Sequence, residues 1–404
     1  MINIQLLRQK NFVLYTLARV ANTAATNMLT VAVGWQVYNL TSDPLDLGII
    51  GLTQFTPVLC LFLFSGIIVD RFDRRFVLSA CEGLHAVATC LLLYYTLSAG
   101  SSVLPIFLIL VLHGVARAFF QPASQAILPN IVSREQFSKA IAYSTSIHKI
   151  AQFAGPALGG LILAVSQALT YLIITCLFVA AALLPLAIRQ SLKVKQTSPL
   201  SIQSLFEGIT YIWNKKIVLG AISIDLMAVL FGTIVGLLPV FARDILNVGA
   251  EGLGILRSMP AIGAVLVGFV LMKIDDLRPA GPLFFIFLLI FSAAIIVFGL
   301  STSFWLSLVA LTVYGGADMV SVYIRSSLVQ LATPNEIRGR VSSVNSVSIN
   351  TSNELGDFRA GLMAAGVGVV PSVLLGGGIT IAVAAIWWRL FPELRSVDRM
   401  TEKL

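Results

Sequence analysis

Fourteen ionisable side chains lie within stretches of this chain that are otherwise apolar, and they are its most chemically capable residues. An ionised side chain in the middle of a bilayer costs from about 2.5 kcal/mol upward, so each one is a functional candidate by default. The set contains both charge signs and all three histidines: Arg19, Glu82, His85, His113, Arg117, His148, Lys149, Asp225, Arg257, Asp318, Arg325, Glu354, Asp357 and Arg359.

Coupling a transport cycle to protons requires a group whose charge changes during the cycle. A buried carboxyl suits this role, because burial favours its protonated form and a nearby arginine favours release of the proton. Asp318 and Glu354 rank first among the candidates, and we expect Asp318 to be bonded to Arg117 or Arg325 in one state and protonated in another. The full set of proton-coupling candidates is Asp318, Glu354, Asp357 and Asp225. Glu82 and His85 are expected to pack within the protein interior.

Apolar stretches long enough to cross a bilayer must position these side chains. The chain has 404 residues, of which 57% are hydrophobic and 11% charged, whereas soluble proteins average about 25% charged. A helix of about 20 predominantly apolar residues spans the hydrocarbon core. The sequence therefore predicts an all-α membrane protein with twelve transmembrane helices, at 12–40, 46–69, 76–98, 103–128, 137–165, 169–189, 217–241, 252–272, 280–300, 304–331, 341–364 and 369–391.

The net charge of +8 does not indicate a nucleic-acid-binding protein, because of where the basic residues lie. Most of the 27 Lys and Arg fall in connections on one side of the predicted membrane, and only Arg243 falls in a connection on the other side. This asymmetry follows the positive-inside rule. We therefore expect both termini to be cytoplasmic and the protein to reside in the bacterial inner membrane, with some attraction to anionic lipids.

The second half of the chain repeats landmarks of the first at an offset of about 205 residues. Leu47–Ile50 corresponds to Leu253–Leu256, and Arg19, His113 and Lys149 correspond to Asp225, Asp318 and Glu354. We infer two pseudo-symmetric six-helix bundles, 1–190 and 217–404, joined by a cytoplasmic linker, 191–216, that contains an amphipathic helix. Such paired bundles rock about a substrate site near the midplane, and the site's walls are expected to carry opposite polarity.

The segment from Gly66 to Arg75 resembles the signature loop between the second and third helices of the Major Facilitator Superfamily. Asp73 replaces the second glycine of that pattern, which resembles the branch of enterobactin exporters and macrolide efflux pumps. The resemblance implies the major facilitator fold and a conformational gating role for the loop, in which Asp70 faces the start of the eleventh helix. The gating residues are Gly66, Asp70, Arg71, Arg74 and Arg75.

A second motif, in the predicted fifth helix, resembles the antiporter motif of the same superfamily. Proline removes a backbone donor and kinks a helix, and glycines allow close approach between helices. The resemblance implies exchange of substrate for protons, although a kinked packing face is the alternative interpretation. The motif residues are Gly155, Pro156, Gly159 and Gly160.

The resemblance also implies that the first, fourth, seventh and tenth helices line the substrate cavity. His113 and Arg117 lie one turn apart on one face, and Tyr314, Asp318 and Arg325 form a stripe on another helix. Polar side chains can also hold helices together, so packing is the alternative for the asparagines and a static ion pair for Arg117. The cavity candidates are Asn22, Asn27, His113, Arg117, Tyr314 and Arg325.

These features predict a secondary active transporter that exports a small amphipathic organic compound, such as a drug, macrolide or siderophore, by proton antiport. The alternatives are a lysophospholipid or metabolite facilitator of the same fold and a non-transporting membrane sensor. An enzyme is disfavoured, because no nucleophile–base set, metal-ligand spacing or phosphate-binding loop is visible. We expect a monomer whose partners are the substrate, protons and lipids, with no cofactor, metal or disulfide.

Overall fold

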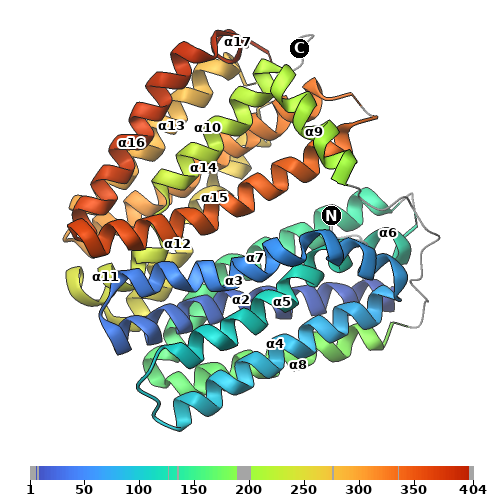
Figure 1. Ribbon diagram of the computed structural model, residues 1–404, viewed down its shortest axis with the longest axis vertical. Helices are drawn as coiled ribbons and strands as arrows, with labels where there is room; N and C mark the ends of the chain where they lie inside the picture. Colours follow the sequence, from blue (N-terminus) through green and yellow to red (C-terminus); the bar gives the residue numbers. More distant parts are fainter. Residues whose placement is uncertain are drawn as a thin grey trace. The chain divides into compact units, whose positions relative to one another are not determined.

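Helices make up the regular secondary structure of the residues that the computed structural model describes, which are 6, 9–125, 127–133, 136–188, 202–274, 277–334 and 336–399. Figure 1 labels the helices along the chain. The long ones are α2 (Lys10–Thr41), α3 (Pro44–Arg71), α4 (Arg74–Leu97), α5 (Leu104–Gln125), α7 (Phe137–Val165), α8 (Gln167–Leu186), α10 (Lys216–Gly232), α12 (Gly249–Leu271), α13 (Ala280–Leu300), α14 (Phe304–Ala332), α15 (Arg338–Val367) and α16 (Val369–Leu390). Shorter elements are α6 (Leu128–Ile131), α9 (Ile202–Asn214), η1 (Val235–Leu237), α11 (Leu238–Val240), η2 (Phe241–Ile245) and α17 (Pro392–Arg395).

Nine segments among the described residues are long and apolar enough to cross a bilayer. Helices α2, α7 and α15, with 32, 29 and 30 residues, are also long but lie outside this set. All three carry several charged or amide side chains, which lower their hydropathy. Their boundaries nevertheless follow the sequence-based spans, and that of α7, Phe137–Val165, coincides with the predicted 137–165.

Apolar side chains cover much of the outer surface of these helices. On α5, Leu104, Leu108 and Val111 recur on one face and are 61%, 63% and 39% exposed. A soluble protein would bury such a stripe, whereas a helix facing lipid has no reason to. The helices satisfy their own backbone hydrogen bonds, as a segment surrounded by hydrocarbon must.

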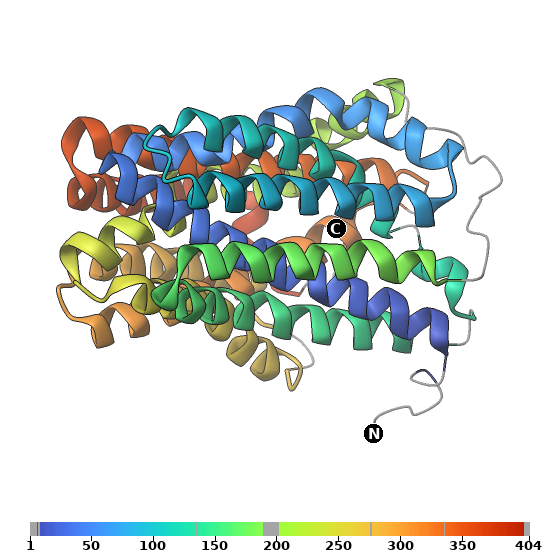
Figure 2. The same ribbon diagram turned by 90° about the horizontal axis from the view of Figure 1, so that it is seen from below.

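The chain divides into two compact units. Unit 1 comprises Met1–Ser42, Leu52–Leu200 and Gly249–Ser258, and unit 2 comprises Asp43–Gly51, Ser201–Val248 and Met259–Leu404. In unit 1, α4 packs on α5 and α8, and α2 packs on α7 and α8. The long helices of this unit run alongside one another in both views (Figures 1 and 2). In unit 2, α13 packs on α14 and α16, and α10 packs on α14, α15 and α16.

Each unit includes the first turns of one helix from the other half of the sequence. The segment 43–51, which opens α3, belongs to unit 2, and the segment 249–258, which opens α12, belongs to unit 1. These two segments contain the matching stretches Leu47–Ile50 and Leu253–Leu256. In each half of the sequence, the matching stretch therefore opens a helix whose first turns belong to the other unit.

The seventh apolar stretch is interrupted, contrary to the continuous helix that we predicted over 217–241. Helix α10 ends at Gly232, and the chain resumes through η1, α11 and the π-helix η2. Gly232, Gly236 and Pro239 lie in this stretch. Glycine and proline both disfavour a continuous helix, so the signal for the interruption was present in the sequence.

The linker helix α9 packs one side against unit 2. Its Ile212 is buried in a cluster with Val218, Val329 and Val341 of unit 2. A second side exposes Phe206 and Trp213, which are 62% and 71% exposed. Tyr211 donates a hydrogen bond to the carbonyl of Ala332, and Glu207 pairs with Arg340. Helix α9 is thus part of unit 2, with a further apolar side left uncovered.

Candidate functional site

The turn between α3 and α4 uses Asp73, the residue that departs from the superfamily pattern, as the N-cap of α4. One oxygen of its carboxylate accepts a hydrogen bond from the backbone N–H of Arg75 at 3.1 Å. The same carboxylate pairs with the Arg75 guanidinium at 2.9 Å. An acidic cap satisfies an unpaired helix-end donor and complements the helix dipole. The substitution of glycine by aspartate therefore has a local structural function.

Arginines make up the other predicted gating residues whose side chains are described, and they differ in exposure. Arg75 donates from Nη1 to the carbonyl of Ile188 at 2.5 Å, which joins the turn to the end of α8. Arg74 is buried and Arg71 is exposed. The side chains of Gly66 and Asp70 lie outside the described residues. Gating by this loop therefore stays a prediction.

The antiporter-type motif provides close contacts between helices, as its glycines predicted. A Cβ added at Gly155 would lie 2.9 Å from the Cβ of Asn27. One added at Gly159 would lie 3.0 Å from the Cα of Met28, and one at Gly160 would lie 2.6 Å from the Cα of Gly254. These distances are too short for a side chain. The motif thus seats α7 against α2 and against the first turns of α12 within unit 1.

An equivalent glycine contact exists in unit 2. A Cβ added at Gly361 of α15 would lie 2.6 Å from the carbonyl oxygen of Pro44 and 3.0 Å from the Cα of Gly48. Gly48 and Gly254 occupy matching positions of the repeat. Close backbone packing of this kind is therefore a repeated feature, and by itself it does not establish antiport.

Two charged side chains of α15 satisfy the backbone at the interruption after α10. Asp357 accepts hydrogen bonds from the Thr233 hydroxyl at 3.1 Å and the Gly236 N–H at 3.2 Å. Arg359 donates to the carbonyls of Leu230 at 3.1 Å and Phe231 at 2.7 Å. Helix ends leave such groups without intrahelical partners. Asp357, a predicted proton-coupling residue, thus helps to hold a broken helix in place.

A buried ion pair joins α10 to α14. Arg325 Nε lies 3.1 Å from Asp225 Oδ1, with side chains only 3% and 8% exposed. Arg325 Nη1 also donates to Asn345 Oδ1 at 2.9 Å. We predicted Arg325 as a cavity residue and Asp225 as a proton-coupling residue, and the structure brings them together. The pairing was not anticipated from the sequence.

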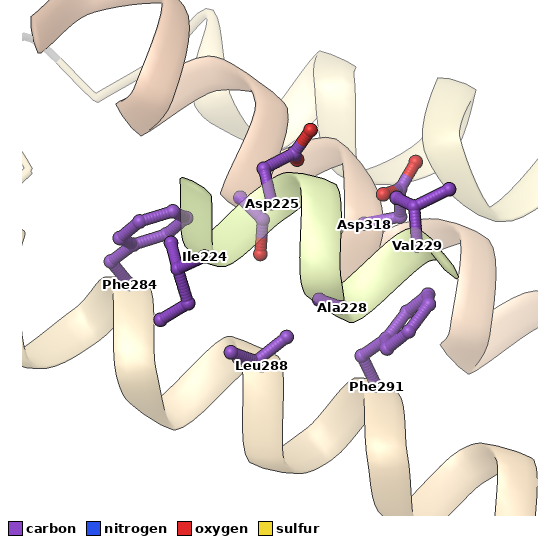
Figure 3. A pocket seen from close by; sticks show the side chains of 9 residues that line it. Ile224, Asp225, Ala228, Val229, Phe284, Leu288, Phe291 and Asp318 are labelled. Carbon is purple, nitrogen blue, oxygen red and sulfur yellow. The ribbon is translucent and has the colours of Figure 1, made fainter. Parts of the chain in front are cut away.

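Asp318 lies near this pair, beside a small cavity of about 10 Å³, roughly the volume needed for one water molecule. The cavity is lined by Asp225, Asp318 and Ser321 together with apolar residues of α10 and α13. Figure 3 shows both carboxylates pointing away from Phe284, Leu288 and Phe291 of α13. Asp318 is half-buried, as is Tyr314 one turn earlier, whose ring stacks on Phe291 with centroids 4.5 Å apart. Partner exchange by Asp318 stays a prediction.

Glu354, the other first-ranked carboxyl, is half-buried on α15. A Cβ added at Gly51 would lie 3.2 Å from its Oε2, so the carboxylate lies against the α3 segment that belongs to unit 2.

The polar groups of unit 1 are paired differently. Asn22 of α2 donates from Nδ2 to Oε2 of Glu82 on α4 at 3.1 Å, and Glu82 is 1% exposed. His85, one turn further along α4, lies with its Nδ1 2.8 Å from Nδ1 of His113 on α5. Glu82 and His85 therefore lie in the interior, as predicted. That Asn22 and His113 are their partners was not foreseen.

The remaining predicted site residues of unit 1 occupy varied surroundings. Arg19 donates to the Ser144 hydroxyl at 3.3 Å, and Thr23 is hydrogen bonded to His148 Nδ1 at 2.8 Å. Asn27 donates back to the carbonyl of Thr23 in its own helix at 2.8 Å. Arg117 is half-buried. Their role in a substrate cavity stays a prediction.

Known proteins with sequences similar to this chain are membrane transport proteins. Residues 3–403 match the family described as transmembrane secretion effector. Macrolide efflux protein A of Streptococcus pyogenes is 23% identical over 385 residues, which cover 92% of this chain and 93% of that protein. The enterobactin exporter of Escherichia coli is 23% identical over 380 residues, covering 94% and 91%. The staphyloferrin A transporter of Staphylococcus aureus is 27% identical over 253 residues, covering 60% and 62%.

Solved structures share the fold at low sequence identity. A mutant of the nucleoside transporter NupG matches with a TM-score of 0.75 and 15% identity, covering 94% of this chain and 100% of that one. A bacterial homologue of the human lysosomal transporter Spinster matches with a TM-score of 0.74 and 15% identity, covering 95% and 96%. Both are transporters, and the homologues and folds include no enzyme. The chain therefore belongs to the transmembrane secretion effector family of the Major Facilitator Superfamily, and it is a multi-pass membrane transporter.

Proposed function

We propose that the protein is a proton-coupled antiporter that exports a small amphipathic organic compound by alternating access. The observation that carries the proposal is that three efflux or siderophore transport proteins align with this chain, two of them over more than nine-tenths of their length. In the proposed arrangement twelve helices form two six-helix bundles in the bacterial inner membrane. Both termini are cytoplasmic, and the protein acts as a monomer.

Buried ionisable groups support coupling to protons. A membrane protein that only needed to fold would gain little from Asp225, Arg325 or Glu82, which lie almost completely buried within apolar helices. Such groups in transporters commonly mark substrate and proton pathways. The four carboxyls predicted from the sequence therefore remain the proton-coupling candidates of unit 2, with Asp318 and Glu354 ranked first. The other two, Asp225 and Asp357, also contribute to the buried ion pair and to the broken helix described above.

The substrate class is proposed from the relatives' names. The named compounds are macrolides, enterobactin and staphyloferrin A, so the proposed substrate is a small organic molecule of the drug or siderophore class. Half-buried aromatic and cationic side chains such as Tyr314 and Arg117 would suit such a molecule.

The test is accumulation of candidate compounds in inverted membrane vesicles under an imposed pH gradient. The panel should contain a macrolide, a catecholate siderophore, a carboxylate siderophore and a cationic dye. We expect at least one compound to accumulate only when the vesicle interior is acidic. Accumulation that is the same with and without the pH gradient would contradict antiport. If the double variant Asp318→Asn with Glu354→Gln accumulates the compound in response to the gradient as wild type does, neither residue takes part in proton coupling.

A further inference from the structure

Buried polar side chains form a line along α4 of unit 1. Glu82, His85 and Thr89 lie at positions that share one face of this helix, and each is at most 1% exposed. They meet Asn22 of α2, His113 of α5 and Thr175 of α8, respectively. The line therefore crosses the interior of unit 1 and contacts three neighbouring helices.

The partner of Glu82 is an amide, which cannot neutralise a carboxylate. Asn22 donates one hydrogen bond at 3.1 Å and is itself only 8% exposed. An isolated ionised carboxylate in an apolar interior is so unfavourable that the group takes up a proton instead. By contrast, the buried Asp225 of unit 2 has the guanidinium of Arg325 at 3.1 Å.

The charged and titratable groups on the helices around Glu82 do not supply a cation at this carboxyl. On its own helix, Cys81 and His85 are neighbours. Helix α8 contributes only Tyr171 and Cys176, and α5 contributes His113 and Arg117. On α2, the Arg19 guanidinium donates to Ser144 and lies 5.8 Å from the centre of the Tyr15 ring. On α7, which packs against α2, His148 bonds Thr23, Lys149 bonds Gln152 and Tyr143 lies against Phe12.

The histidine pair is a poor place to store an additional proton. Two Nδ1 atoms 2.8 Å apart share one hydrogen, so at least one ring must be neutral. The two rings are also close, with centroids 4.2 Å apart and planes tilted by 47°, and the centroid of the Phe178 ring lies 5.1 Å from that of His85. Arg117 follows His113 by one turn on α5, so a cation already lies on the same helix face as this pair. A second positive charge here would be repelled, which leaves Glu82 as the group of this line that can change its charge.

We propose that Glu82 is a proton-binding site of the transport cycle, protonated in the conformation described here and ionised in a conformation in which water reaches its carboxyl. The step breaks the O–H bond of the carboxyl and delivers the proton to water, and the Asn22 amide can donate to the carboxylate that remains. This inference rests on the proposed proton antiport, and it adds a site in unit 1 to the carboxyl candidates of unit 2.

Infrared spectroscopy of the full-length protein in lipid tests the protonation state without a substrate. We expect a protonated-carboxyl C=O stretch at neutral pH that is absent from Glu82→Gln and unchanged in Glu251→Gln, which removes an exposed carboxyl on α12. Asn22→Ala removes the hydrogen bond to this carboxyl and should shift the band without abolishing it. If Glu82→Gln fails to fold, this shift still identifies the residue. A band unaffected by both Glu82→Gln and Asn22→Ala would overturn the proposal.

Transport tests the role of the proton, with the macrolide erythromycin as probe. In inverted vesicles, Glu82→Gln should lose at least ten-fold of the accumulation driven by a pH gradient but keep substrate counterflow, and Glu82→Asp should restore part of the gradient response. Gradient-driven accumulation in Glu82→Gln equal to wild type would overturn the proposal. A wild-type protein that moves erythromycin without responding to the gradient would contradict the proposed antiport, while the infrared result would still decide whether Glu82 holds a proton.

Discussion

The two units of this transporter stabilise their buried polar groups in opposite ways. In unit 2, Asp225 is matched by Arg325, and the charges of Asp357 and Arg359 are matched by backbone groups at a broken helix. In unit 1, Glu82 meets an amide and His85 meets another histidine. Opposite charges hold one another in a fixed protonation state, whereas neutral partners leave a carboxyl free to gain or lose a proton. The comparison suggests a structural role for unit 2's pairs and a titrating role for unit 1's.

The largest expected effect comes from breaking the ion pair. Asp225→Ala leaves Arg325 charged and buried, which should lower the free energy of unfolding by about 3–5 kcal/mol. Glu82→Gln keeps an oxygen that can accept from Asn22 and should cost less than about 1 kcal/mol. Unfolding in mixed micelles measures both. Equal losses in the two variants would remove the distinction between the units.

The next largest loss of stability is expected when the hydrogen bonds from Arg359 to the end of α10 are removed. Arg359→Leu leaves the carbonyls of Leu230 and Phe231 without their donor, at a cost of about 1–3 kcal/mol for each unsatisfied group. Faster amide hydrogen exchange should accompany this loss around Gly232–Gly236. Lys149→Leu is the matched control, since it removes an exposed cation. Unchanged exchange in Arg359→Leu would show that the interruption is held by other contacts.

The glycine contacts should be equally sensitive in both units, because the internal repeat places them in equivalent surroundings. Gly160→Ala and Gly361→Ala should each destabilise by about 1–3 kcal/mol through overpacking. Gly366→Ala is the control, as no atom lies within 4 Å of a Cβ added there. Thermal unfolding of the three purified variants measures the effect. If only one of Gly160→Ala and Gly361→Ala lowers the unfolding temperature, the two glycine contacts are not equivalent.

A smaller effect is expected at the turn before α4. Asp73→Ala removes the N-cap and the pairing with Arg75, and caps of this kind contribute about 1 kcal/mol. Asp73→Asn keeps the hydrogen bond acceptor and should recover most of the stability. If Asp73→Asn loses as much as Asp73→Ala, the ion pair rather than the cap accounts for the contribution.

The smallest effect concerns pH at the exposed end of unit 2. The Glu393 carboxyl is hydrogen bonded to its own backbone, and Lys216 Nζ lies 3.4 Å from its Oε1. Both interactions hold the pKa of this carboxyl below its ordinary value of 4.5. Because this pKa is lower in the folded state, its stabilisation is present above pH 4.5 and is lost as pH falls through the folded pKa. Glu393→Gln should therefore match wild type in acid and be slightly less stable at neutral pH, as measured by unfolding at both pH values.

The sequence predicted the positions of most helices because each apolar stretch is bounded by polar residues or glycine. The ends of α13, at Ala280 and Leu300, coincide with the predicted span 280–300. The interruption after Gly232 was missed, since apolar length was weighed above the glycines and proline of that stretch. The match between segments 43–51 and 249–258 is visible in the sequence as a repeat of Leu-Gly-Ile.

The partners of the buried polar groups were harder to predict. Which side chains meet depends on the rotation of each helix about its axis, and a helix that is apolar on nearly every face does not define that rotation. The Asp225–Arg325 and His85–His113 contacts therefore had no signal in the spacing of either helix alone. Only the i, i+3 relation of Glu82 and His85 was readable.

Proton flux measured together with substrate flux tests the central claim most directly. Purified protein is placed in vesicles that enclose a pH-sensitive dye, and a compound found to accumulate in the vesicle panel is added on one side. The account predicts a proton movement opposite to the substrate in wild type and in Glu251→Gln, and none in Glu82→Gln. Substrate movement through the wild-type protein with no accompanying proton flux would contradict it.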